Sequence, residues 1–157
     1  MRKKNIFYLV LLILLIFIDQ ISKFLIVNYL NDSFILIKNF LSFSFIKNTG
    51  AAFGMFSGST FMIIMITLLL IIYLFYDMHK NFDKKLNVIF NILILSGAIG
   101  NLIDRVFRGY VVDFVSFILF NRQMPVFNIA DIFITFGVIG LIFVMFKEEK
   151  NERDNCK

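Results

Sequence analysis

The sequence contains almost none of the residues that cross-link a fold or bind transition metals. Cys156 is the only cysteine, so the chain has neither an internal disulfide nor a cysteine-based zinc site. His79 is the only histidine, and it lies beside Lys80 between two apolar runs, which is typical of a solvated loop histidine. We therefore expect a protein that uses no metal and no cofactor.

Tryptophan is absent and there is a single proline, whereas apolar residues are in excess. The 157 residues are 59% hydrophobic, include 22 phenylalanines and have a mean hydropathy of +0.84. Soluble domains are about 45–50% apolar, so the excess is expected to face lipid. With no tryptophan for the membrane interface, the tyrosines are the candidate interfacial anchors. They are Tyr8, Tyr29, Tyr73, Tyr76 and Tyr110.

The formal net charge of +5 does not indicate a nucleic-acid partner. Most lysine and arginine residues lie at the ends of the apolar runs, and they form no basic stripe along one face. The expected partners are therefore membrane lipid and a substrate, with no nucleic acid, and the chain is expected to be a monomer.

The apolar runs predict an all-α membrane protein with four transmembrane helices in one integral membrane domain, residues 1–157. The spans are expected at about residues 5–28, 59–76, 86–103 and 126–146. The first run also fits a signal peptide, but no A-x-A cleavage site follows it, which favours a retained helix. The charged tail from Lys147 onward is expected to be frayed and solvated.

The distribution of positive charge predicts the orientation of these spans. Four spans place both termini on one side, which would carry ten Lys and Arg residues against five on the opposite side. The positive-inside rule then puts both termini in the cytoplasm. The end of the first span, the end of the third and the start of the fourth would all lie near the extracytoplasmic face of the cell membrane.

The segment at about residues 31–58 has a different pattern. Leu41, Phe43 and Phe45 alternate with Ser42 and Ser44, and this period of two predicts a strand. The stretch that follows, residues 47–54, gathers small residues and glycines, as a tight turn requires. We expect a small extracytoplasmic β-rich element resting on the bilayer, with an ordinary loop as the alternative.

Ionisable residues in or beside hydrocarbon are costly, and they are therefore functional candidates. Asp19 and Lys23 are spaced as a helical ion pair in the first span, either as a neutralised pair or as a support for a site. A second group of polar and small residues shares one face of the third span. It comprises Gly97, Gly100, Asn101, Asp104 and Arg105. The alternative is a helix-packing face closed by an Asp104–Arg105 pair.

Asp113 and Asp131 flank one connection that leaves and re-enters the same membrane face. Asn128 is one turn before Asp131 and on the same face. Two carboxylates close together share a proton, so that one can activate water while the other polarises a peptide carbonyl. The alternative for Asp131 is a carboxylate stabilised only by a helix N-terminus.

Five sequence blocks, in order, resemble lipoprotein signal peptidase, the bacterial type II signal peptidase family of membrane aspartic proteases. They are Asp19-Gln-Ile-Ser-Lys23, Asn48-Thr-Gly-Ala-Ala-Phe-Gly54, Gly97-Ala-Ile-Gly-Asn-Leu-Ile-Asp-Arg105, Gly109-Tyr-Val-Val-Asp-Phe114 and Pro125-Val-Phe-Asn-Ile-Ala-Asp131. They cover nearly the whole chain, although Ile132 stands where the family often has serine.

The resemblance implies a catalytic pair, Asp113 and Asp131. It implies that Asn48, Asn101, Arg105 and Asn128 orient the substrate, and that Asp19, Lys23, Asp104, Gly50, Gly97 and Gly100 support the site. The implied substrate is a prolipoprotein whose cysteine carries diacylglycerol, cleaved just before that cysteine. The implied fold is four transmembrane helices with a small extracytoplasmic β element.

Three other functions fit parts of the pattern. A proton- or cation-coupled transporter also carries intramembrane carboxylates, but the inner halves of the second and fourth spans are apolar. A metal-dependent hydrolase would have to hold a hard cation with carboxylates alone. A non-enzymatic assembly factor would tolerate the isosteric change Asp113→Asn.

Overall fold

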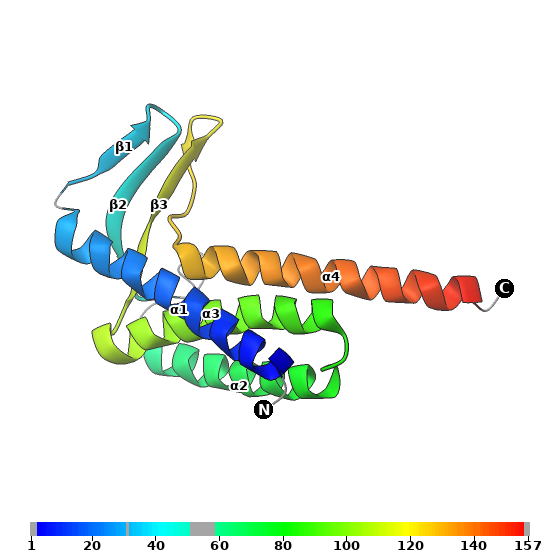
Figure 1. The fold of residues 1–157 in the computed structure, drawn as a ribbon. Helices are drawn as coiled ribbons and strands as arrows, with labels where there is room; N and C mark the ends of the chain where they lie inside the picture. The colour runs from blue at the N-terminus through cyan, green and yellow to red at the C-terminus, as the bar shows by residue number, and fades with distance from the viewer. Residues whose placement is uncertain (1–2, 31, 51–58, 156–157) are drawn as a thin grey trace.

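The computed structural model describes residues 3–30, 32–50 and 59–155. This part contains four helices long and apolar enough to cross a membrane. They are α1 Lys3–Tyr29, α2 Thr60–Lys80, α3 Lys85–Arg108 and α4 Ile129–Asn155. The prediction of four membrane-spanning helices is therefore confirmed, and Figure 1 shows the start of α1 and the end of α4 toward the same end of the helices.

Two polar segments are more helical than the sequence predicts. α2 continues through Lys80, so His79 lies in its last turn and not in a loop, and the Asn81 N–H donates to the Asp77 carbonyl at 2.9 Å. α4 continues through Asn155, so the prediction of a frayed tail is wrong for this stretch. Ion pairs along the tail, Lys84–Glu148 at 2.8 Å and Arg153–Glu149 at 3.6 Å, favour the extended helix.

The helices pack around α3. In the apolar 18-residue stretch of each helix, 56% of α3 is buried, against 11% of α1, 11% of α2 and 22% of α4. Val88, Ile92 and Leu95 of α3 are completely buried. α3 is therefore the central helix, and the other three present most of their apolar surface to lipid.

Two glycines allow this close packing. A Cβ on Gly97 would lie 2.3 Å from the carbonyl oxygen of Ala130 in α4, and one on Gly100 would lie 2.4 Å from Oδ2 of Asp19 in α1. Any larger side chain at these positions would push α3 away from its neighbours. The predicted small-residue packing face is thus confirmed, with one glycine facing each of two helices.

A four-stranded antiparallel sheet lies at one end of the helices, in the order β1-β2-β3-β4 (Figure 1). The strands are β1 Phe34–Ile37, β2 Leu41–Asn48, β3 Val111–Leu119 and β4 Arg122–Gln123. The strand predicted from the alternation at residues 41–45 is part of β2. Residues 51–54 of the predicted glycine-rich turn are outside the described part of the chain.

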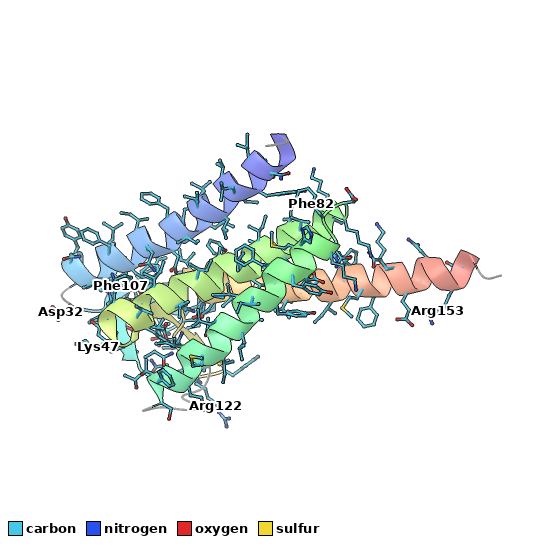
Figure 2. All side chains as sticks on the ribbon, turned by 90° about the horizontal axis from the view of Figure 1, so that it is seen from below. Asp32, Lys47, Phe82, Phe107, Arg122 and Arg153 are labelled. Atoms are coloured by element: carbon cyan, nitrogen blue, oxygen red, sulfur yellow. The ribbon has the colours of Figure 1, made fainter. Side chains whose placement is uncertain are left out.

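The sequence did not indicate that the connection between the last two spans also forms a strand. β3 pairs with β2 from Leu41↔Phe117 to Asn48↔Val111, with an irregularity between Phe43 and Ile46. The first four residues of β3 are all buried, so its hydrophobicity does not alternate. This pairing joins the two extramembrane segments into one element. Figure 2 shows Asp32, Lys47 and Phe107 at the sheet end of the helices and Phe82 and Arg153 toward the other end.

Candidate active site

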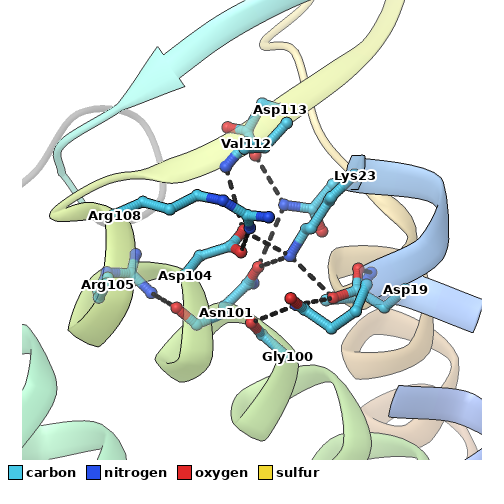
Figure 3. Close-up of polar contacts among 12 residues, drawn as sticks. Asp19, Lys23, Gly100, Asn101, Asp104, Arg105, Arg108, Val112 and Asp113 are labelled. Atoms are coloured by element: carbon cyan, nitrogen blue, oxygen red, sulfur yellow. Dashed lines mark hydrogen bonds and ion pairs between the residues drawn. The ribbon is translucent and has the colours of Figure 1, made fainter. Parts of the chain in front are cut away.

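A fully buried lysine lies at the centre of a polar cluster where α1, α3 and the sheet meet (Figure 3). Lys23 Nζ is 2.9 Å from Asp19 Oδ2 and 3.0 Å from Asp104 Oδ2, and all three side chains are completely buried. The predicted Asp19–Lys23 pair therefore forms. The Asp104–Arg105 pair does not, because Asp104 instead pairs with Lys23 and Arg108.

Backbone groups complete the cluster. The Ala130 N–H donates to Asp19 Oδ1 at 2.9 Å, and the Val112 N–H donates to Asp104 Oδ2 at 3.2 Å. The two aspartates thus fasten the start of α4 and the start of β3 to α1 and α3. With its Lys and Arg partners the cluster carries no net charge, which makes its burial tolerable.

Lys23 also fixes the side chain of Asn101. Its Nζ donates to Asn101 Oδ1 at 2.9 Å, and Asn128 Nδ2 donates to the same oxygen at 3.1 Å. The Asn101 oxygen can only accept, so it must face these two donors. The Asn101 NH₂ group therefore points the other way, where it donates to Asp131 Oδ1 at 2.9 Å. The buried cation therefore sets the direction of a hydrogen bond to an aspartate that it does not touch.

Asn128 connects the two candidate aspartates. Its Nδ2 donates to Asp113 Oδ1 at 2.7 Å as well as to Asn101. Its Oδ1 accepts the Asp131 N–H at 3.0 Å, while Asp131 Oδ2 accepts the Asn128 N–H at 3.1 Å. This reciprocal pair is a capping box at the start of α4. The helix N-terminus thus stabilises Asp131, as one of the two interpretations of the sequence predicted. Asp131 also accepts a hydrogen bond from Asn101.

Asp113 projects from β3 and is 3% exposed. Its second oxygen, Oδ2, accepts from Asn48 Nδ2 of β2 at 2.8 Å. The Asn48 amide is itself oriented, because its Oδ1 accepts the Gly50 N–H at 2.9 Å. Burial raises the pKa of Asp113 from 3.8 to about 6; the Asn48 amide opposes that rise, and the nearby charge of Asp131 adds to it.

Arg105 lies beside the pair and binds the backbone. Its Nη2 donates to the Gly50 carbonyl at 2.9 Å, and its Nη1 is 3.4 Å from the Asn101 carbonyl. Its Nε is buried and has no partner in the described part of the chain. The guanidinium thus joins α3 to the segment after β2.

The structure brings the site residues predicted from the sequence to one end of the helices. Asp113 and Asp131 are linked by two amides, Asn48 and Arg105 complete the surroundings, and Gly97 and Gly100 allow the close packing. Sequence reasoning gave no role to Gln20, whose Nε2 donates to Asp19 Oδ2 and to the Gly100 carbonyl, each at 3.1 Å. Its position next to Asp19 was the only signal. The backbone donors of Val112 and Ala130 left no signal at all.

The family model described as signal peptidase (SPase) II matches residues 11–147. The chain belongs to the signal peptidase II family. It is therefore a membrane-spanning peptidase, and the transporter interpretation is not favoured.

Named relatives agree along most of the chain. A lipoprotein signal peptidase of Caldanaerobacter subterraneus is 43% identical over 87% of this chain and 94% of its own length. One of Bacillus pumilus is 40% identical over 95% of this chain and 98% of its own length. One of Staphylococcus aureus is 36% identical over 90% of this chain and 89% of its own length.

A solved structure shares the fold of this signal peptidase II family member. It is a bacterial membrane enzyme determined by the in meso method at 2.3 Å resolution, with a TM-score of 0.86 and 35% identity. The similarity covers 92% of this chain and 90% of that one. The arrangement of four helices and a small sheet is thus a property of known membrane enzymes.

Proposed function

We propose that this chain is an aspartic endopeptidase that removes signal peptides from diacylglyceryl-modified prolipoproteins, cleaving before the lipidated cysteine. The observation that carries the proposal is the linked pair Asp113 and Asp131. Membership of the signal peptidase II family and the names of its relatives support the substrate class.

The pair has the chemistry that peptide hydrolysis requires. Burial raises the pKa of Asp113 to about 6, which favours this carboxyl as the one that holds the shared proton below that pH and polarises the scissile carbonyl. The Asp131 carboxylate takes a proton from water as the water oxygen bonds to the carbonyl carbon. Asp131 then gives its proton to the leaving nitrogen, and the C–N bond breaks.

The remaining residues would hold the pair and the substrate. Asn101 and Asn128 keep the carboxylates at a fixed separation, and Asn48 orients Asp113. Arg105 holds the Gly50 carbonyl beside the pair. A diacylated substrate stays in the bilayer, so a site where helices end and a sheet begins suits cleavage at the membrane interface. The positive-inside count supports an extracytoplasmic location for this site in the cell membrane.

Cleavage of a diacylglyceryl-modified prolipoprotein by the detergent-purified protein tests the proposal. We expect Asp113→Asn and Asp131→Asn each to lower the rate at least about a thousandfold, since each removes an acid–base group. EDTA is expected to leave the wild-type rate unchanged.

Asp83→Asn is the matched control, because Asp83 is exposed in the turn between α2 and α3. Its rate should equal that of the wild type, and melting curves should show all three variants folded. Normal cleavage by either site variant would disprove the aspartic pair, and loss of activity in EDTA would indicate a metal-dependent hydrolase instead.

A further inference from the structure

The two hairpins of the sheet end in neighbouring tips. The Phe40 carbonyl, just after the β1–β2 turn, accepts the Ile118 N–H of β3 at 2.9 Å. We use the term sheet tip for five exposed charged or apolar residues in or beside these two turns. They are Lys38, Phe40, Leu119, Phe120 and Arg122.

The β3–β4 turn holds a phenylalanine in a conformation that phenylalanine disfavours. Leu119 pairs with Arg122, and both residues between them have positive φ, 50° at Phe120 and 58° at Asn121. Two-residue turns of this kind favour Asn and Gly, because bulky side chains are strained there. Phe120 is 98% exposed, so contacts within the described chain do not compensate for the strain or for the exposed ring.

Several large apolar side chains near Phe120 are exposed. Phe40 is 40% exposed, Leu119 41% and Met124 41%. All four residues of β1 are apolar and exposed, although successive side chains of a strand point to opposite faces. An edge strand of this kind in water would be prone to aggregation, which indicates that it is covered in the native setting.

Apart from the buried Asp113, the charged residues of the sheet are all positive. Residues 33–50 and 114–127 contain no Asp or Glu, and their charged residues are Lys38, Lys47 and Arg122. Lys38 and Arg122 flank the exposed phenylalanines, one in each hairpin. Aromatic rings bordered by cations suit the boundary between acyl chains and anionic headgroups.

The sheet tip lies at the depth of the helices. In Figure 1 the strands run across the direction of the helices, and along that direction the tip of the β3–β4 hairpin lies beside the first turns of α4 and not beyond the helix ends. Figure 2 agrees, since it places Arg122 farther along the helix direction than Lys47 and Phe107. The tip therefore does not project away from the membrane; it overhangs the lipid beside the helices.

We propose that the sheet tip is a second membrane anchor, in which Phe120 and Phe40 insert into the adjacent leaflet while Lys38 and Arg122 bind anionic phospholipid headgroups. This anchor is independent of the peptidase reaction. It holds the sheet, and with it Asp113 on β3, at a fixed height over the bilayer.

The absence of tryptophan allows a direct test in the full-length protein. Phe120→Trp creates a single-tryptophan protein, which is placed in lipid nanodiscs of mixed phosphatidylcholine and phosphatidylglycerol with bromine on the acyl chains of one lipid at a time. We expect blue-shifted emission and strong quenching, with brominated phosphatidylglycerol quenching about twice as strongly as brominated phosphatidylcholine. Phe40→Trp is a second reporter in case the hairpin does not accept tryptophan at residue 120.

Two single-tryptophan controls set the scale. Phe17→Trp lies on the lipid-facing surface of α1 and should be quenched, whereas Asp154→Trp lies on the exposed tail and should not. Adding Lys38→Gln and Arg122→Gln to Phe120→Trp should remove the preference for phosphatidylglycerol. Adding Lys84→Gln and Lys85→Gln, at the other end of the helices, should leave that preference intact.

Red-shifted emission without quenching in both reporters would show that the tip is in water and overturn the proposal. Blue-shifted emission without bromine quenching would show that protein covers the tip, which also overturns it. Equal quenching by the two brominated lipids would refute the role of Lys38 and Arg122.

Discussion

At the scale of single residues, the site is built from side-chain amides whose orientation is fixed by hydrogen bonds. Asn101 and Asn128 each have one end held by a fixed partner, so the other end faces an aspartate. All four oxygens of Asp113 and Asp131 accept an N–H hydrogen bond. The carboxylates therefore cannot rotate freely, which is the pre-organisation that acid–base chemistry requires.

The protonation of Asp113 predicts a pH dependence. With a pKa raised to about 6, the folded site keeps the shared proton below this pH and loses it as the pH rises through it. We expect kcat/KM to fall over this range. Asn48→Ala removes a donor that favours the ionised form, so the pKa should rise and the fall should move about one pH unit higher.

The pH–rate profile of the two proteins checks this prediction. Asn28→Ala is the matched control, because the Asn28 amide is exposed and, among the described residues, donates only to the Phe24 carbonyl. It should reproduce the wild-type profile. A profile that moves to lower pH in Asn48→Ala would contradict the role given to that amide.

Replacing the buried Lys23 should lower the stability of the protein, and a second substitution should restore part of it. Lys23→Met leaves the buried carboxylates of Asp19 and Asp104 without their shared cation, which should cost about 3–5 kcal/mol of unfolding free energy. Asp104 still pairs with Arg108, so adding Asp19→Asn removes the carboxylate that is left without a cation and should restore part of the loss.

Thermal melting of the detergent-solubilised variants measures both effects. Lys38→Met is the control, since Lys38 is exposed at the sheet tip, and its melting temperature should be unchanged. A Lys23→Met protein as stable as the wild type would mean that the ion cluster does not hold the helices together.

At the scale of elements, the separation of α3 from its neighbours sets the separation of the site residues. Asn101 and Asp104 follow Gly97 and Gly100 by one turn. Their partners are carried by α4 and α1, the two helices that touch these glycines. A small shift between α3 and α4 therefore lengthens the Asn101–Asp131 hydrogen bond directly.

Gly97→Ala should accordingly reduce activity without touching an ionisable group. Its Cβ would meet the Ala130 carbonyl at 2.3 Å, so α4 must move and the rate should fall at least about tenfold. Gly109→Ala is the control, because nothing lies within 4 Å of its Cβ and only its positive φ of 78° is strained. That variant should lose about 1 kcal/mol of stability and keep most of its activity.

At the scale of the whole molecule, the chain has a polar end and an apolar body. The site and the sheet lie together at one end, and the lipid-facing surfaces of α1, α2 and α4 extend from it (Figure 2). The ion cluster around Lys23, which carries no net charge, lies at the boundary between them. This polarity fits a reaction that takes place at the membrane surface and not across the membrane.

The predicted orientation can be tested with the single native cysteine. A membrane-impermeant maleimide should label Cys156 in inside-out vesicles and not in intact spheroplasts, because the positive-inside rule places the C-terminus in the cytoplasm. In a Cys156→Ser background, Asp32→Cys should show the opposite pattern. Labelling of Cys156 from outside would reverse the proposed location of the site.

The sequence by itself determined that this is a membrane protein with four spans, and it identified the ionisable residues that are candidates for the site. Long apolar runs have only one stable environment, and each carboxylate placed beside them is conspicuous because of its cost. The strand at residues 41–45 was also predictable, since its hydrophobicity alternates.

Only the tertiary structure decided how these parts meet. β3 was not predictable because both of its faces are covered at its start, which removes the alternation. Its pairing with β2 brings Asn48 to Asp113, 65 residues away, and the packing of α3 against α4 brings Asn101 to Asp131, 30 residues away. The direction of each amide depends on a third partner, such as Lys23 for Asn101, and such contacts arise only from the packing of distant elements.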